Sequence, residues 1–481
     1  MNYVHYFWNI YTISALWLLY VITIISCIVV VLSENRNPIR SLAWVIALIF
    51  LPGIGLVFYA FFGRSMRGRH IISRQNKRRI FHTQAKKHDL KGHNLTPTEQ
   101  QVVKLTHQVS RYPYTLNNRA QIFTTGKEKF DTLKRDLKGA KESIYLQYYI
   151  FQDDHLGQEI AGILMEKARE GVEVKVIYDH VGSFSSSSKF FKKMKETGVD
   201  AHPFFRVTFP QLANRINWRN HRKIVVIDRK TGYIGGMNIA DRYYLGKQGD
   251  GLAWRDTHLR LEGDIVESLL YSFSMDWNFL KQDAPLLHIE PPMALEEKNE
   301  TGMQLLTSGP TDQFDSLELS YLRAIAGATK CVYIQTPYFL PTDSLQRALV
   351  GAALSNVDVR IMLPIKSDSK MLQYASFSYI TQCLKAGIKV YLYNPGMLHS
   401  KMMIVDDSFV TTGSVNFDFR SFENNFESTL LIYDKEINRE MKDIFFEDLQ
   451  ECRKLTISKW RKRPLFQRQM ESLLRLLSPI L

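Results

Sequence analysis

A pattern of three chemically active residues, His-x-Lys-x4-Asp, occurs twice in this chain, and no other feature constrains its fold as strongly. Each copy continues, after the same gap, into a Gly-x-x-Asn, which runs from Gly235 to Asn238 and from Gly413 to Asn416. Coincidence rarely reproduces a motif together with its downstream spacing. The repeat therefore predicts two similar halves that share one active site, and paired His and Lys side chains suit an anionic phosphodiester. The motif residues are His221, Lys223, Asp228, His399, Lys401 and Asp406.

The residues that follow each His indicate where the motif side chains point. The stretches 223–228 (KIVVID) and 401–406 (KMMIVD) are apolar and β-branched, which is typical of short buried strands. Because residues two apart share one face of a strand, each His is predicted to point the same way as its Lys. Asp228 and Asp406 have the opposite parity, so we expect them to brace the fold by accepting hydrogen bonds and not to touch substrate.

Strand and helix patterns alternate in both halves. The first half shows a strand over 143–151, a helix over 157–171 and a strand over 172–179; the second shows a strand over 331–339, a helix over 343–354 and a strand over 357–363. This alternation predicts a mixed or parallel sheet flanked by helices in each half. A polar, Pro-containing stretch near 290–303 marks the boundary. The matching residues Gln147, Tyr148, Gln335 and Tyr338 either line a pocket or fill the core.

Charge and cysteine content limit the partners and the compartment. The chain has 481 residues, enough for more than one domain, and carries a net charge of +14. This charge suits an anionic partner, either nucleic acid or acidic lipid headgroups. The four cysteines are scattered and form no CxxC pair, so neither a disulfide framework nor a zinc site is indicated. His and Asp are not clustered at metal-ligand spacing, and no metal or other cofactor is predicted.

The N-terminus favours lipid over nucleic acid. Residues 6–33 are uncharged and long enough to cross a bilayer, and 41–63 form a second uncharged stretch, interrupted by Pro52 and Gly53. The first stretch has no basic n-region and no A-x-A cleavage site, which argues against a secretory signal. We therefore predict a two-helix transmembrane hairpin that makes the chain an integral membrane protein.

Basic residues that follow the second stretch predict the orientation of this hairpin. By the positive-inside rule, the protein is multi-pass in the cell membrane with its catalytic halves on the cytoplasmic side. The same basic run either pairs with anionic lipids or is a solvated linker. Its members are Arg64, Arg67, Arg69, Arg74, Lys77, Arg78, Arg79, Lys86 and Lys87.

With these motifs the chain resembles the phospholipase D superfamily, whose signature is the duplicated HxKxxxxD element, and within it the bacterial cardiolipin synthases. The supporting segments are NRNPIRSLAW (35–44), LPGIG (51–55), NWRNHRK (217–223), WRDTH (254–258), LPIKSDS (363–369) and RLLSPIL (475–481). The resemblance implies an α/β fold class, with two tandem phospholipase D-like αβ sandwich domains of mixed sheets flanked by helices. The implied divisions are the hairpin 1–63, a basic juxtamembrane linker 64–118, the two domains 119–293 and 294–451, and a basic amphipathic C-terminal segment 452–481.

The resemblance also implies roles for the site residues. A neutral His221 attacks phosphorus to form a covalent phosphatidyl-histidine, and His399 acts as general acid and then base. The two histidines are expected to differ in protonation state and therefore in environment. Lys223 and Lys401 hold the non-bridging oxygens, and further hydrogen bonds come from Asn238, Asn416 and Ser414. No metal takes part.

The two halves differ around these residues. Gly236 stands where the second half has Ser414, so the first half lacks one hydroxyl donor. In the family, a carboxylate from later in the same half orients each His. Glu427 has the usual spacing in the second half, eleven residues after its Asn, whereas Asp256 is the candidate in the first half with Asp250 as the alternative.

The implied function is that of a cardiolipin synthase, which joins two phosphatidylglycerol molecules into cardiolipin and releases glycerol. The expected partners are phosphatidylglycerol and anionic membrane lipids, and not nucleic acid; the oligomeric state stays open. The segment 459–481 either lies on the membrane or packs on the catalytic halves. The alternative functions are a phospholipase D that hydrolyses phospholipids to phosphatidic acid, a nuclease, which the apolar N-terminus argues against, and a non-catalytic membrane scaffold, which has no need of two intact His/Lys pairs.

Overall fold

The structure is a computed structural model that describes residues 2–33, 38–51, 53–59, 63, 95–207, 217–247, 251, 253–280 and 300–478. The basic run 64–87, Asp250 and most of the expected boundary at 290–303 lie outside the described residues. The chain divides into two compact units. One comprises 1–66 with 207–217, and the other comprises 67–206 with 218–481.

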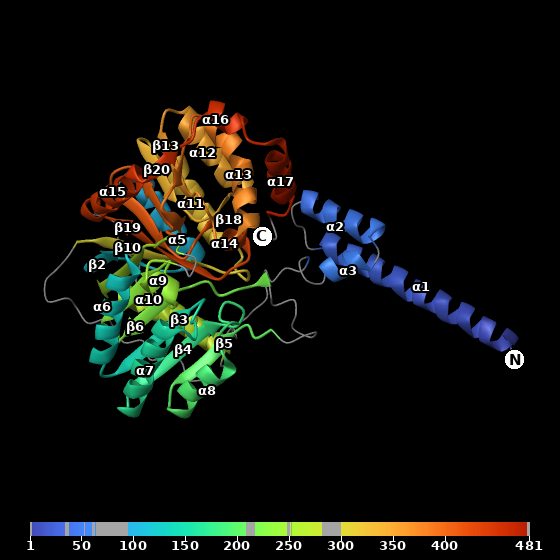
Figure 1. The fold of residues 1–481 in the computed structure, drawn as a ribbon, viewed down its shortest axis with the longest axis horizontal. Coiled ribbons are helices and arrows are strands. Elements are labelled where there is room, and N and C mark those ends of the chain that lie inside the picture. The colour runs from blue at the N-terminus through green and yellow to red at the C-terminus, as the bar shows by residue number, and fades with distance from the viewer. Residues whose placement is uncertain are drawn as a thin grey trace. The chain divides into compact units, whose positions relative to one another are not determined.

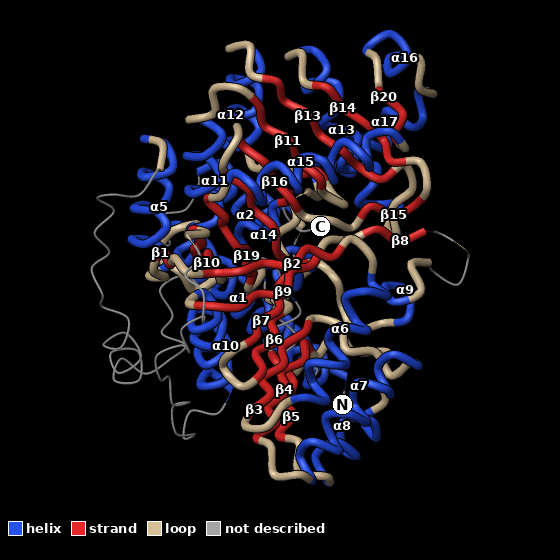
Figure 2. Tube along the Cα trace, turned by 90° about the vertical axis from the view of Figure 1, so that its left-hand side faces the viewer, coloured by secondary structure: helices blue, strands red, loops and turns tan. Residues whose placement is uncertain are grey.

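The larger unit contains two large sheets, of seven and nine strands, and seven strands follow the same order in both. Figures 1 and 2 show where these strands lie. The first sheet runs β2 (Asn118–Phe123), β9 (His258–Gly263), β7 (Thr231–Gly235), β6 (Ile224–Ile227), β3 (Ser143–Tyr148), β4 (Glu173–Asp179) and β5 (Asp200–Phe204). The second runs β1 (Tyr114–Thr115), β10 (Gly302–Ser308), β19 (Glu427–Tyr433), β17 (Phe409–Gly413), β16 (Met402–Val405), β11 (Cys331–Gln335), β13 (Asp358–Pro364), β14 (Lys389–Tyr393) and β20 (Cys452–Lys454).

These strand orders confirm the tandem repeat. Strands β10 to β14 of the second sheet match β2 to β5 of the first one for one, with β1 and β20 added at the edges. Both sheets are mixed as predicted, because β3–β4–β5 and β11–β13–β14 pair in parallel and the other pairs are antiparallel. In Figure 1 the first half is the cyan-to-green lower part and the second half is the yellow-to-red upper part.

Helices cover both faces of the first sheet. Successive side chains of a strand point to opposite faces, so neighbouring residues contact different helices. Gln147 of β3 faces α10 (Ile265–Leu280), where its Nε2 donates a 2.6 Å hydrogen bond to Asp276. Its neighbour Tyr148 faces α6 (Gly126–Gly139), and the Tyr148 hydroxyl accepts a 2.9 Å hydrogen bond from Lys129. Gln147 and Tyr148 are therefore buried core residues and do not line a pocket.

The second sheet repeats this arrangement. Gln335 of β11 donates a 2.8 Å hydrogen bond to Asp448 of α15 (Lys435–Gln450), the counterpart of Asp276 on α10. Its side chain is fully buried. The opposite face packs on α11 (Ser316–Ala326) and α12 (Asp343–Leu354), whose bounds match the predicted helix 343–354.

The segment expected to be a juxtamembrane linker is partly structured. Helix α5 (Pro97–Ser110) begins with a capping box between Thr96 and Glu99, packs on α11, and leads into β1, which pairs with β10. Residues 97–115 therefore belong to the second half, contrary to the expected linker. The C-terminal segment also starts within the sheet, as β20 beside β14.

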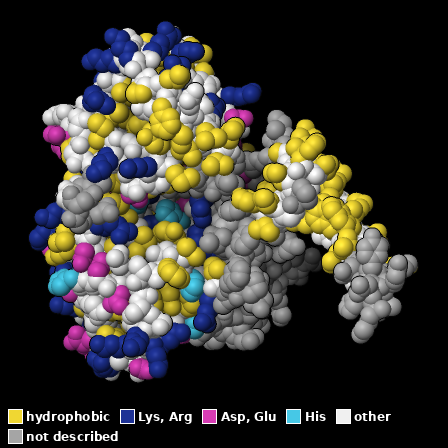
Figure 3. Space-filling model, turned by 45° about the vertical axis from the view of Figure 1, so that its right-hand side comes forward, with side chains coloured by type: hydrophobic (Ala, Val, Ile, Leu, Met, Phe, Trp, Pro, Cys, Tyr) yellow, Lys and Arg dark blue, Asp and Glu magenta, His cyan; other side chains and the backbone are white. Residues whose placement is uncertain are grey.

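The smaller unit holds α1 (Asn2–Ser33), α2 (Pro38–Phe50) and α3 (Ile54–Phe58). Within α1, residues Tyr11–Val29 are long and apolar enough to cross a membrane, with a mean hydropathy of 2.3. Between Tyr11 and Leu32 the helix exposes many large hydrophobic side chains (Figure 3). The second apolar stretch is not one continuous helix. Helix α2 stops at Phe50, and Gly53 adopts a φ of 76° before α3 begins, so the predicted second spanning helix is not confirmed.

Candidate active site

Each His lies on a segment that pairs with the other half of the molecule. Phe426 N donates to Arg219 O at 2.8 Å, and His221 N donates to Phe426 O at 2.9 Å. On the other side, β15 (Gly396–Leu398) pairs in parallel with β8 (Ala253–Arg255), and His399 N donates to Arg255 O at 2.7 Å. Both histidines are thereby placed where the two halves meet.

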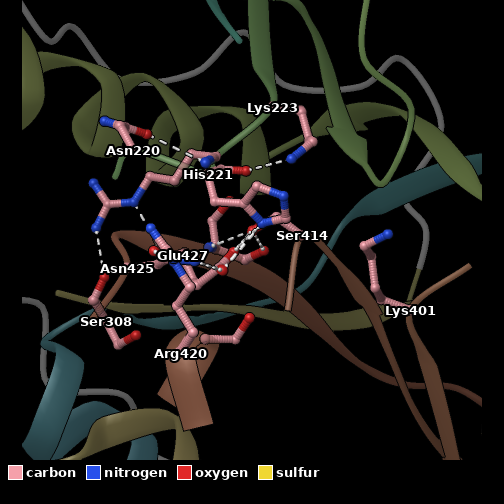
Figure 4. A network of polar contacts seen from close by, with 12 residues as sticks. Asn220, His221, Lys223, Ser308, Lys401, Ser414, Arg420, Asn425 and Glu427 are labelled. Carbon is pink, nitrogen blue, oxygen red and sulfur yellow. Dashed lines mark hydrogen bonds and ion pairs between the residues drawn. The ribbon is translucent and has the colours of Figure 1, made fainter. Parts of the chain in front are cut away.

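This pairing crosses the carboxylates between the halves. His221 Nδ1 lies 3.0 Å from both carboxylate oxygens of Glu427, at the start of β19 (Figure 4). His399 Nδ1 lies 2.6 Å from Oδ2 of Asp256, which follows β8. The expectation that each carboxylate serves the His of its own half is therefore wrong. The physical reason is the parallel pairing of each His segment with the chain that leads into the other half's carboxylate.

Strand register identifies Asp256 as the counterpart of Glu427. Gly413 stands opposite Thr429, and Gly235 stands opposite His258. Glu427 and Asp256 each lie two residues before the partner of that glycine. Their unequal spacing in sequence comes from a longer connection between β7 and β8 in the first half.

The difference between Gly236 and Ser414 follows from the two carboxylates. The Ser414 hydroxyl donates to Glu427 and accepts a 3.0 Å hydrogen bond from Ser428 N. At Gly236 an added Cβ would lie 2.1 Å from Oδ1 of Asp256. The carboxylate of Asp256 thus occupies the space that a side chain at position 236 would need, and the first half has no room for a counterpart of Ser414.

The two lysines lie beside their histidines as the strand parity predicts. Lys223 Nζ donates to His221 O at 2.6 Å, and Lys401 Nζ donates to His399 O. Lys401 Nζ also lies 2.8 Å from His399 Nδ1. Figure 4 shows Lys223 and Lys401 approaching the His221 side chain from different strands. Both ammonium groups are buried, so their charges act at close range.

Burial controls the protonation of the histidines. It lowers the pKa of His221 to about 4, with Glu427 opposing the decrease and Lys223 and Lys401 adding to it. Burial also lowers the pKa of His399 to about 4, with Lys401 adding to the decrease and Asp256 opposing it. Both rings are therefore neutral at pH 7 when no substrate is bound. The expected difference in protonation between His221 and His399 is not present in this state.

Both carboxylates are ionised despite burial. Burial raises the pKa of Glu427, but His221, Lys223 and Ser414 together outweigh it, and the net pKa is lowered. Lys401 and His399 have the same effect on Asp256. An ionised carboxylate accepts the Nδ1–H of its imidazole and leaves Nε2 with the lone pair. Each ring therefore presents Nε2 as a nucleophile or base.

The lysines are themselves perturbed by burial. It lowers the pKa of Lys223 well below its usual value, opposed mainly by Glu427. It lowers the pKa of Lys401 to about 8, opposed by Asp256. Lys401 of the second half adds to the lowering of the pKa of His221 in the first half, as expected for one shared site.

The third residue of each motif has the structural role that its parity predicts. Asp228 accepts hydrogen bonds from the backbone N–H groups of 141–143 at 2.7–2.9 Å. Asp406 accepts from those of 329–331 at 2.7–3.1 Å. Each therefore ties the end of β6 or β16 to the start of β3 or β11.

The two asparagines differ in their engagement. Asn238 donates to the Tyr243 hydroxyl at 2.8 Å and accepts from Ile150 N at 3.2 Å. The Asn416 side-chain oxygen is buried and has no hydrogen-bond partner within the described part of the chain. Asn416 is therefore the more available of the two for a ligand.

Sequence reasoning missed the aromatic walls of the site. The ring of Tyr149 lies 4.9 Å from that of His221, and Trp254 and Tyr243 lie 5.5 and 5.6 Å from His399. The sequence allowed Tyr148 either a pocket or a core position, and its parity directs it into the core. Strand parity points to Tyr149 instead, since it lies on the opposite face from Tyr148.

A buried ion pair behind His221 was also missed. Arg222 Nη1 lies 2.8 Å from both oxygens of Asp276, and its other nitrogens donate to Ser308 O and Glu427 O at 3.1 Å. Asn220 Nδ2 donates to the same Asp276 at 2.8 Å. The available signal was position: Arg222 lies between His221 and Lys223, so it must point to the opposite side.

The site combines two neutral imidazoles with ionised partners and two buried ammonium groups. This set can attack phosphorus, move a proton to and from an alcohol, and neutralise phosphoryl oxygens. Within the described part of the chain, no three His, Cys, Asp or Glu side chains are grouped so as to hold a metal ion.

Comparisons with known proteins agree with this geometry. Residues 133–277 and 321–449 match the family described as cardiolipin synthase, PLD-like domain, and 16–64 match the phospholipase D-nuclease N-terminal family. The major cardiolipin synthase of Bacillus subtilis is 38% identical over 96% of this chain and 98% of its own length. A cardiolipin synthase of Oceanobacillus iheyensis is 37% identical over 97% of this chain and 98% of its own length.

Solved structures show the same fold at low sequence identity. The phosphatidylserine synthase of Haemophilus influenzae superposes with a TM-score of 0.62 at 15% identity, over 79% of this chain and 100% of its own. The polyphosphate kinase of Porphyromonas gingivalis reaches a TM-score of 0.50 at 14% identity, over 75% of this chain and 52% of its own. The full-length matches above decide the relationship more finely, and the chain belongs to the cardiolipin synthase family of phospholipase D-like proteins.

Proposed function

We propose that this protein is a cardiolipin synthase that transfers a phosphatidyl group from one phosphatidylglycerol to another, giving cardiolipin and glycerol. The observation that carries the proposal is the pair of neutral, carboxylate-bound histidines at the junction of the halves, each with a buried lysine. Relatives that match nearly the full chain are named cardiolipin synthases.

In the first step His221 is the nucleophile. Its Nε2 lone pair attacks the phosphorus of one phosphatidylglycerol, forming a P–N bond while the bond to the glycerol oxygen breaks. His399, which takes up a proton on Nε2 when the anionic lipid binds, gives that proton to the glycerol oxygen, and glycerol leaves. Lys223 and Lys401 stabilise the charge on the non-bridging oxygens, and Glu427 keeps the proton of His221 on Nδ1.

In the second step the covalent phosphatidyl-histidine is resolved. His399, now neutral, takes the proton from the headgroup hydroxyl of a second phosphatidylglycerol. That oxygen attacks phosphorus, the P–N bond breaks, and cardiolipin forms with His221 restored. One alcohol replaces another at phosphorus, so we expect the reaction to be reversible.

The rival function is hydrolysis by the same residues. A phospholipase D would use water in the second step and release phosphatidic acid. The buried site favours the transferase, because both histidines are less than a tenth exposed and aromatic rings cover them.

The activity is tested with purified full-length protein in mixed micelles that contain labelled phosphatidylglycerol. We expect the wild type to form cardiolipin and glycerol in equal amounts. His221→Ala and His399→Ala should each lose on the order of a thousandfold in rate or more, since each removes an acid/base or nucleophilic group. Phosphatidic acid as the main product would identify a phospholipase instead. Activity that survives both substitutions would refute the two-histidine mechanism.

We also propose that the N-terminal region anchors the protein as a two-pass hairpin with the catalytic halves in the cytoplasm. Helix α1 supplies one apolar segment of spanning length, and the second apolar stretch, though broken near Gly53, has no charged residue between 41 and 63. The basic run 64–87 is expected to remain on the cytoplasmic side.

This topology is tested by fusing a fluorescent protein that matures only in the cytoplasm to the N-terminus or to the C-terminus. A two-pass hairpin places both ends in the cytoplasm, so both fusions should fluoresce. A single pass through α1 would leave the N-terminal fusion dark, and would show that the second stretch does not cross.

A further inference from the structure

The C-terminal helix α17 (Leu465–Leu476) carries two apolar faces, and among the described residues of the larger unit only one of these faces has a partner. Its inner face packs on α13 (Lys370–Lys385), with Leu474 buried and Arg475 stacked 4.6 Å from the ring of Tyr379. The buried Glu471 is paired with Arg463 at 2.7 Å. The packing expected as one alternative for this segment is therefore present.

The outer face is exposed and hydrophobic. Leu465, Phe466, Leu473 and Leu476 are 67, 72, 56 and 76% exposed. At 3.6 residues per turn these four side chains fall within a sector of about 100°, on the side of the helix away from Leu474. A helix that only packed on α13 would carry polar residues there. Four large exposed side chains on one helix face mark an interaction surface.

The charges around this face point to an anionic partner. The segment 457–478 contains six basic residues and a single acidic one, and that acid, Glu471, is buried and neutralised by Arg463. Lys459, Arg461, Lys462, Arg468 and Arg475 are exposed. Figure 3 turns the side that carries α17 forward and shows exposed hydrophobic side chains beside Lys and Arg in the upper half. Hydrophobic residues flanked by basic ones suit the interface of an anionic bilayer.

Helix α13 connects this face to the active site. Its N-cap Ser369 directly follows Asp368, which accepts a 2.7 Å hydrogen bond from Tyr338 and acts electrostatically on both His399 and Lys401. Met371, in the first turn of α13, is 47% exposed. Helix α13, on which α17 packs, thus begins directly after a residue that acts on His399.

From these observations we propose that the outer face of α17 inserts into the interfacial region of an anionic phospholipid bilayer and holds the half that carries His399 against it. This inference rests on the proposed function, because it explains how a lipid leaves the bilayer for a buried site. It adds a second membrane contact, separate from α1. The bilayer is the single partner proposed, and a second copy of the chain or another protein would be a contrary outcome.

The test places an environment-sensitive fluorophore on the full-length protein reconstituted in vesicles. In a background without its native cysteines, Leu473→Cys carries the label, and Leu354→Cys is the matched control. Leu354 is 68% exposed at the end of α12 and does not belong to the outer face of α17. In vesicles of phosphatidylglycerol and phosphatidylcholine, we expect lipids brominated in the acyl chain to quench the label at 473 and not at 354. Phosphatidylcholine alone, or high salt, should weaken the quenching.

Several results would overturn the proposal. The label at 473 would stay in water, or be quenched no more than the label at 354, if the face does not enter the bilayer. A label at 473 that is shielded from water but not quenched by the lipids would indicate a protein partner. The readout needs no turnover, so it separates this proposal from the proposed activity.

A second measurement ties the contact to substrate delivery. Phe466→Ser with Leu473→Ser should slow cardiolipin formation from vesicles by on the order of tenfold, with Leu354→Ser as the control. The rate on short-chain phosphatidylglycerol below its micelle concentration should stay unchanged. Equal loss on both substrates would contradict a role in membrane contact.

Discussion

The two histidines pose a problem of protonation at the residue scale. Both have a pKa of about 4, so both are neutral at pH 7, yet His399 must carry a proton on Nε2 to release glycerol. The bound phosphodiester supplies the missing charge. An anion close to an imidazole favours the charged imidazolium and raises its pKa. At a fixed pH of 7, a pKa that rises from about 4 past 7 means that a proton is taken up.

We therefore expect lipid binding to take up about one proton at pH 7. Calorimetric titration of His221→Gln with short-chain phosphatidylglycerol, in buffers of different ionisation enthalpy, measures this uptake without turnover. The double variant with His399→Gln should lose it. Uptake that persists in the double variant would assign the proton to a lysine and contradict the role given to His399.

The glycine at position 236 gives a second prediction at this scale. Gly236→Ala places a Cβ 2.1 Å from Oδ1 of Asp256, so Asp256 and the His399 ring that it holds must shift. A shift of this size in a catalytic group costs on the order of a hundredfold in kcat. Ser414→Ala removes one donor to Glu427 and the acceptor of the Ser428 N–H but displaces no catalytic group, so it should cost about 1 kcal/mol, or roughly fivefold in kcat. Similar rates for the two variants would show that Asp256 does not position His399.

At the scale of elements, the sequence predicted what depends on local pattern. Alternation located β3, β4, α7 (His155–Arg169), β11, α12 and β13, and strand parity separated Asp228 and Asp406 from the reactive pairs. It did not predict α5 and β1 as part of the second sheet, because the edge strand is two residues long and its pairing with β10 is non-local. Pro52 and Gly53 indicated an interruption near residue 53. They did not predict that α2 ends at Phe50 and that only the short α3 follows.

The crossing of the carboxylates can be measured directly. A double-mutant cycle on thermal unfolding isolates the coupling between two side chains. We expect coupling of roughly 0.5–3 kcal/mol for His221 with Glu427 and for His399 with Asp256, the pairs in hydrogen-bond contact. The same-half pairs, His221 with Asp256 and His399 with Glu427, should couple more weakly. Stronger coupling within the halves would contradict the crossed arrangement.

At the scale of the whole molecule, the crossing explains why the site could be predicted only in part. The duplicated motif specified two halves and one site, and spacing found Glu427. The assignment of each carboxylate to a His depends on how segment 219–221 pairs with 425–427 and how β15 pairs with β8. These contacts join residues more than 140 positions apart, and no periodicity in the chain records them. Each half therefore completes the other's catalytic group.

This mutual completion predicts that the halves unfold together, and Arg222 tests it. Its guanidinium binds Asp276 of the first half and the carbonyls of Ser308 and Glu427 of the second. Arg222→Gln leaves the buried Asp276 without its cation, which should lower the free energy of unfolding by about 3–5 kcal/mol. Arg360→Gln removes a pair with the partly exposed Asp358 and should cost about 1 kcal/mol or less.

Denaturant unfolding gives the size of the effect, and amide hydrogen exchange shows its extent. In Arg222→Gln we expect the central strands β3 and β11, one in each half, to lose protection by the same factor, because both open only in global unfolding. In Arg360→Gln protection in both strands should fall by about fivefold at most, in line with its smaller cost. Loss of protection in β3 alone would mean that the first half opens while the second stays folded, and that the shared site does not bind the two halves into one cooperative unit.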